Sequence, residues 1–122
     1  MIKTTNKDLS CKVMDAGIEI DADMLHVTDQ WKEQKLLHKD SIDYITDVVR
    51  VPAPTACEWF EVMPLKYSVL TQKIDKGFRA SCEKDGWFEF RTADTPADAL
   101  AMMALWLVER GLWNEQKKEE KR

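Results

Sequence analysis

The sequence predicts an α+β domain in which a small antiparallel sheet packs against two or three helices. Three short runs rich in aromatic and β-branched residues are separated by turns that contain glycine. They predict a three-stranded meander over Leu65–Ile74, Phe78–Glu83 and Trp87–Arg91. A strongly apolar helix is predicted after them, over 96–110. A chain of 122 residues has room for one such domain, which we place at residues 1–113.

Capping residues mark the first and the last helix. Asn6 or Asp8 can accept a hydrogen bond from the free N–H groups at the start of a helix over 7–16. Thr95 can do the same for the helix over 96–110, where a proline stands at the first helical position. We expect both helices to pack on the meander, because each has an apolar face to bury.

Two further elements are predicted between these helices. Thr55 and Glu58 stand three residues apart, which is the spacing of a capping box, and predict a helix over 55–63 that leads into the meander. The runs Met24–Thr28 and Gln34–His38 have β character and are interrupted by polar residues. Met24, Val27 and Trp31 also suit a helical spacing, but no cap marks a helix start, so we prefer a hairpin.

Two segments give other signals. Residues 41–51 suit either one helical turn or a strand with a bend, before prolines impose an extended connection. Residues 114–122 are almost wholly polar and offer no apolar side chain to bury. We expect them to form a flexible charged tail.

Charge and composition disfavour several classes of function. Eighteen Lys and Arg against 22 Asp and Glu give a net charge of −4, which supplies no basic stripe for phosphates and disfavours nucleic acid as a ligand. No apolar run has the length of a membrane span, and the first residues lack the apolar run of a signal peptide. We expect a cytoplasmic protein without membrane contact. Three cysteines, far apart in the sequence, favour reduced thiols.

The sequence shows no constellation of catalytic, cofactor-binding or metal-binding residues. Its two histidines, His26 and His38, lie twelve residues apart and outside the spacings of metal ligands. Its four glycines do not form the cluster that cradles a phosphate. We therefore expect no metal, no cofactor and no catalytic residue.

The helix over 96–110 is apolar nearly all round, whereas a surface helix needs only one apolar stripe. One interpretation is that the sheet covers one side of this helix and the N-terminal helix or a loop covers the other. The other interpretation is a surface for a protein partner or a second copy of the chain. Aromatic and methionine side chains are enriched at such interfaces, so this hypothesis places the surface at Met102, Trp106 and Trp113.

Two alternatives from other classes stay open. One is a small enzyme whose site is assembled from dispersed groups, such as Asp23, His26, His38 and Cys82. The other is a weak nucleic-acid-binding module, which requires five basic residues to gather on the exposed face of the meander: Lys66, Lys73, Lys76, Arg79 and Lys84.

Four segments together resemble a group of small proteins encoded by phages and prophages. They are the KDLSCKVMDAG helix at 7–17, the VPAPT stretch at 51–55, the strand start at 77–80 and the helix TADTPADALAMMALWLVERG at 92–111. The resemblance implies helices around a small sheet and transfers no activity, because the group has none assigned. The order of three strands and a helix also looks like the protein-binding half of some antitoxins, at the level of the fold.

These observations together favour a non-enzymatic phage or prophage accessory protein in the cytoplasm of a bacterial host. We expect it to act through contacts with a protein partner or with a second copy of itself.

Overall fold

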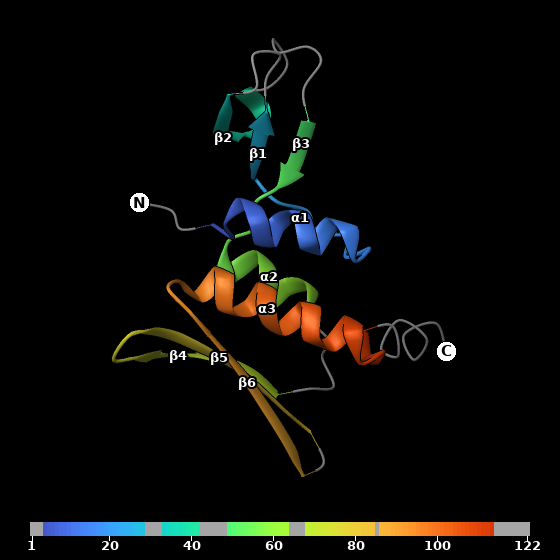
Figure 1. The fold of residues 1–122 in the computed structure, drawn as a ribbon, viewed down its shortest axis with the longest axis vertical. Coiled ribbons are helices and arrows are strands. Elements are labelled where there is room, and N and C mark those ends of the chain that lie inside the picture. Colours follow the sequence, from blue (N-terminus) through green and yellow to red (C-terminus); the bar gives the residue numbers. More distant parts are fainter. Residues whose placement is uncertain (1–3, 29–32, 42–48, 64–67, 85, 114–122) are drawn as a thin grey trace.

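The computed structural model describes residues 4–28, 33–41, 49–63, 68–84 and 86–113 (Figure 1). Within them, helices and antiparallel strands form an α+β fold, as predicted. The helices are α1 (Lys7–Asp15), α2 (Ala56–Val62) and α3 (Pro96–Glu109). The strands are β1 (Met24–Thr28), β2 (Gln34–His38), β3 (Val49–Pro52), β4 (Ser68–Ile74), β5 (Gly77–Lys84) and β6 (Trp87–Ala93).

Helices separate two three-stranded sheets. One sheet has the order β2-β1-β3, and the other is the predicted meander β4-β5-β6. In Figure 1 the first sheet lies at the top, followed by α1, then α2 and α3, and the meander lies below them. The predicted hairpin is confirmed, with Met24 opposite His38 and Thr28 opposite Gln34. The second pairing of β1, with β3, completes the upper sheet.

The position of α1 differs from the prediction. We expected α1 and α3 both to pack on the meander, but α1 packs on α3 and on β3, while α3 alone covers the meander. The reason is that α3 is buried on several sides: eight of its 14 residues are buried. It therefore needs the sheet on one side and α1 and α2 on others, which confirms the interpretation of its apolar surface as largely core.

The predicted helix starts are confirmed in atomic detail. The side chain of Asn6 accepts a hydrogen bond from the N–H of Leu9 at 2.9 Å. Thr55 and Glu58 form a complete capping box at the start of α2. Of residues 41–51, the described part holds the end of a 3-10 turn over Lys39–Ser41 and strand β3. The predicted tail at 114–122 lies outside the described residues.

One buried threonine joins the segments at the centre of the fold. Thr5 is fully buried, and its N–H and hydroxyl both donate to the carbonyl oxygen of Pro54, at 2.8 and 2.9 Å. The indole N–H of Trp59, itself fully buried in α2, donates to the Thr5 hydroxyl at 2.8 Å. The Thr5 carbonyl oxygen lies 2.7 Å from Nε2 of His26 in β1.

A second hydrogen bond ties the N-terminal segment to α3. The N–H of Asn6 donates to the buried carboxylate of Asp98 in the first turn of α3, at 2.7 Å. A carboxylate near a helix N-terminus is also favoured by the helix dipole. The starts of α1 and α3 are therefore fixed to each other.

We predict that Thr5→Val destabilises the fold by about 1 to 3 kcal/mol, because the buried indole N–H of Trp59 then loses its acceptor. Urea unfolding followed by tryptophan fluorescence measures the change. The matched control is Thr92→Val, at an exposed position of β6. Equal stability of the two variants would contradict the role of the Thr5 hydroxyl.

Candidate interaction surface

The meander has two faces of different character. Ala80 and Cys82 of the central strand β5 are fully buried, and α3 packs on this strand. Side chains alternate across a strand, so Arg79, Ser81 and Glu83 lie on the opposite, outer face. Figure 1 shows the helices on one side of this sheet only. No described element covers the outer face.

Large apolar side chains gather on this outer face. The strand register places Leu70 and Phe90 on either side of Ser81. Leu70 is 51% exposed, Phe90 45% and Phe88 56%. Ser81 between them is only 5% exposed, because its larger neighbours stand over it. We call the set Leu70, Arg79, Ser81, Phe88 and Phe90 the outer patch.

The outer patch is held together by contacts among its own side chains. The rings of Phe88 and Phe90 have their centroids 6.1 Å apart at a tilt of 41°. The guanidinium of Arg79 lies 5.6 Å from the Phe90 ring centroid and donates to Oε1 of Gln72 at 2.8 Å. Exposed aromatic rings beside an arginine are typical of the residues that dominate binding at protein interfaces.

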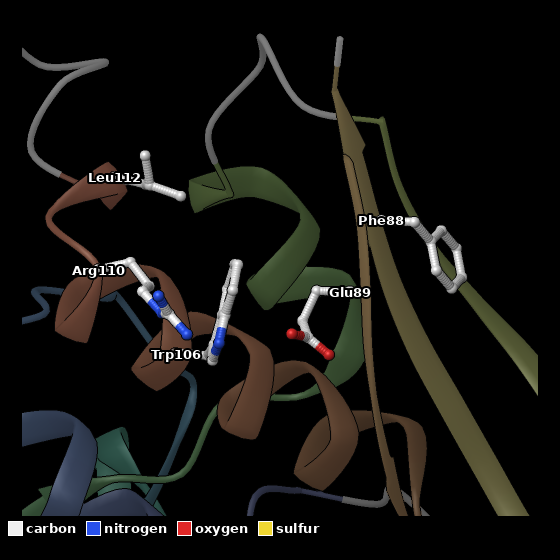
Figure 2. A pocket seen from close by; sticks show the side chains of 5 residues that line it. All are labelled: Phe88, Glu89, Trp106, Arg110 and Leu112. Carbon is white, nitrogen blue, oxygen red and sulfur yellow. The ribbon is translucent and has the colours of Figure 1, made fainter. Parts of the chain in front are cut away.

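Trp106 lies on the other side of the meander. It is half-buried against the core, with Arg91 of β6 5.8 Å and Arg110 5.5 Å from its ring centroid. An open pocket of about 370 Å³ lies beside it. Figure 2 shows the carboxylate of Glu89 pointing toward Trp106; Phe88 also lines this pocket, with its ring directed away from Trp106.

One carboxylate and two guanidinium groups stand at this pocket, and the carboxylate is paired within the chain. The carboxylate of Glu89 accepts hydrogen bonds from the N–H of Phe90 at 3.2 Å and from Arg91 at 2.9 Å. The N–H of Phe90, followed by Arg91 and Arg110, lowers the pKa of Glu89 below its ordinary value. Arg91 contacts both Glu89 and the ring of Trp106, and Arg110 contacts the same ring, so the pocket does not point to a particular charged ligand.

The predicted surface at Met102, Trp106 and Trp113 is not a single exposed patch. Met102 and Trp106 are half-buried. Trp113 is 7% exposed and belongs to the core, so the expectation that it extends a patch outward is wrong. Gly111 has a φ of 74°, and the chain turns back there and carries Trp113 inward. The sequence reasoning missed the outer patch, because the alternation of Phe88 and Phe90 with charged residues does not specify which face of the strand is covered.

The structure separates Cys82 from the other three residues of the hypothetical dispersed enzyme site, which lie in or next to the hairpin of β1 and β2. Cys82 is in the meander beneath α3, whereas His26 and His38 are in the upper sheet (Figure 1). Asp23 forms an ion pair with Lys39 at 3.4 Å, and Nε2 of His26 contacts the Thr5 carbonyl. Within the described ranges, no group of three or more His, Cys, Asp or Glu side chains could hold a metal.

The basic residues proposed for nucleic acid do not share one face. Lys73 pairs with Phe78 in the register, so it lies on the opposite face from Arg79. Lys76 is exposed in the turn between β4 and β5. Lys66 and the side chain of Lys84 lie outside the described part of the chain.

We predict that Cys82 stays unmodified in the native protein at about pH 8 while exposed Cys57 reacts with iodoacetamide. Burial raises the pKa of the Cys82 thiol from 9.0 to about 11. Since the folded-state pKa is the higher one, the neutral thiol's contribution to stability is full below pH 9 and is lost as the pH rises toward 11. Peptide mapping by mass spectrometry measures the labelling. Equal rates at the two cysteines would contradict the burial of Cys82.

No family model matches the chain, and no curated protein or solved structure matches it. Among the described helices, none has both the length and the apolar character needed to cross a membrane.

Proposed function

We propose that this chain is a non-enzymatic accessory protein of a phage or prophage, in the cytoplasm of a bacterial host, and that it acts through protein–protein contacts at the outer patch. The observation that carries the contact role is the exposure of Leu70, Phe88 and Phe90 on one face of the meander. The phage origin rests on the sequence segments that resemble phage and prophage proteins.

The energetics support a contact surface. Burying a large apolar side chain that was exposed contributes about 1.5 to 3 kcal/mol. Three such side chains, each about half exposed, therefore offer several kcal/mol to a partner that covers them. Single exposed apolar residues are ordinary on protein surfaces, but a contiguous group marks an interaction site. The rings of Phe88 and Phe90 are in contact, and Leu70 lies on the same face, across Ser81 from Phe90.

The geometry of the patch also favours binding. Its side chains stand on strands whose backbones are paired over seven residues. Arg79 is held by both Gln72 and the ring of Phe90. Side chains that are ordered before binding lose less conformational entropy when a partner covers them.

We predict that Phe88→Lys lowers the recovery of a bound host or phage protein about tenfold or more, because an ammonium replaces an apolar anchor worth more than 1.4 kcal/mol. The measurement is affinity purification of the tagged chain from lysogen lysate, with quantitative mass spectrometry. The matched control is Phe60→Lys, since Phe60 is 40% exposed but lies on α2. Thermal unfolding checks that both variants fold. Equal recovery for all three proteins contradicts the proposal, and so does the absence of any captured protein if the chain also fails to associate with itself.

A further inference from the structure

The charges on the outer face of the meander are arranged symmetrically. Arg79 and Glu83 lie on the same face of β5, each two residues from Ser81, which is about 7 Å along the strand. One is positive and the other negative, and no ion pair joins either to another described residue. Ser81 lies at the centre, with Leu70 and Phe90 directly beside it in the register.

We infer that the outer patch is the contact surface of a homodimer, in which two copies stack meander on meander about a twofold axis. The axis lies between the two stacked sheets and parallel to them. It passes over Ser81 and runs at right angles to β5. This inference rests on the proposed function, because it names the partner that covers the same face.

The twofold axis pairs opposite charges. Rotation about it reverses the direction of β5, so Arg79 of one copy lies over Glu83 of the second copy, and the reverse pair forms as well. A twofold interface is self-complementary in this way, since the same patch serves both sides. An axis parallel to β5 would instead place like charges together.

The same axis brings the apolar residues together. It runs across the strands, over Leu70, Ser81 and Phe90. Leu70 therefore lies near Leu70 of the second copy, and Phe90 lies near Phe90 of the second copy. Sheets that stack face to face lie about 10 Å apart and have their strands nearly aligned. The small side chain of Ser81 at the centre leaves room for the apolar residues on both sides to meet.

The charge balance favours a second copy over a charged partner. Nucleic acid and anionic membranes select surfaces of one positive sign. Among the described residues, the outer face of β5 carries Arg79 and Glu83 at equal distances from Ser81. It therefore matches a surface that has a positive and a negative group at the same spacing. Its own copy has that surface.

The expected dimer is weak. Three strands of about seven residues cover roughly 14 by 23 Å, or about 300 Å² of flat sheet from each copy. Interfaces at this small end of the range are transient. We expect a dissociation constant in the range of about 1 to 100 μM, and the protein must be studied across that range.

The test is a charge exchange followed by sedimentation velocity on purified full-length protein. Arg79→Glu and Glu83→Arg each place like charges together twice, and each alone weakens dimerisation about tenfold or more. Mixing the two variants pairs opposite charges again, so a heterodimer forms with near wild-type affinity. The double variant, with both charges exchanged, dimerises as the wild type does. Arg50→Glu, at an exposed position of β3 in the other sheet, is the control and leaves the dimer unchanged.

Each outcome decides the inference. Recovery on mixing supports the twofold geometry, even if the single variants are less stable. If every variant dimerises as the wild type does, the outer patch is not the dimer interface. If mixing the two single variants does not restore dimerisation, the proposed twofold axis is wrong. A wild-type chain that stays monomeric throughout overturns the homodimer. If Phe88-dependent capture of another protein persists in that case, the proposed contact role of the patch stands without the homodimer.

Discussion

The fold depends on the burial of one polar residue, Thr5, whose backbone and hydroxyl groups need partners. Pro54 and Trp59 supply them from one segment and His26 from another, both distant from Thr5 in sequence. A buried polar group without a hydrogen bond is costly, so these segments share one arrangement that satisfies all of them. The hydrogen bond from the next residue to Asp98 extends this constraint to α3. The upper sheet, α2 and α3 are thus joined through a few buried atoms.

The position of α3 determines which face of the meander stays exposed. Ala80 and Cys82 present small side chains to the helix, which lets α3 lie close to the central strand. The larger residues Leu70, Phe88 and Phe90 are on the opposite face. Large apolar side chains therefore lie on both faces of the meander, since Val69 packs against the core on the side of α3. Since burial of large apolar groups gives the greater gain, the side away from α3 has the most to gain from a second contact.

Short-range signals predicted the elements well, whereas long-range pairing decided the functional surface. Thr55 and Glu58 lie within one helical turn, so their capping box could be recognised from the sequence alone. Phe88 and Phe90 alternate with Glu89 and Arg91, and alternation alone places the aromatic pair inward. In the structure Arg91 lies beside the ring of Trp106 in α3. The charged residues of β6 therefore face the helix, and Phe88 and Phe90 face outward. That choice depends on register with β5 and on α3, which local patterns do not specify.

The same argument explains why Trp113 does not extend the predicted partner surface on α3 outward. A helix that is apolar all round has the same sequence pattern whether its extra face meets its own chain or another protein. Here α1, α2 and the meander divide the surface of α3 among them, and the turn at Gly111 brings Trp113 into the core. The helix has little apolar surface left to offer. The exposed apolar area lies on the sheet, where the strands that cover one side of α3 present their other face outward.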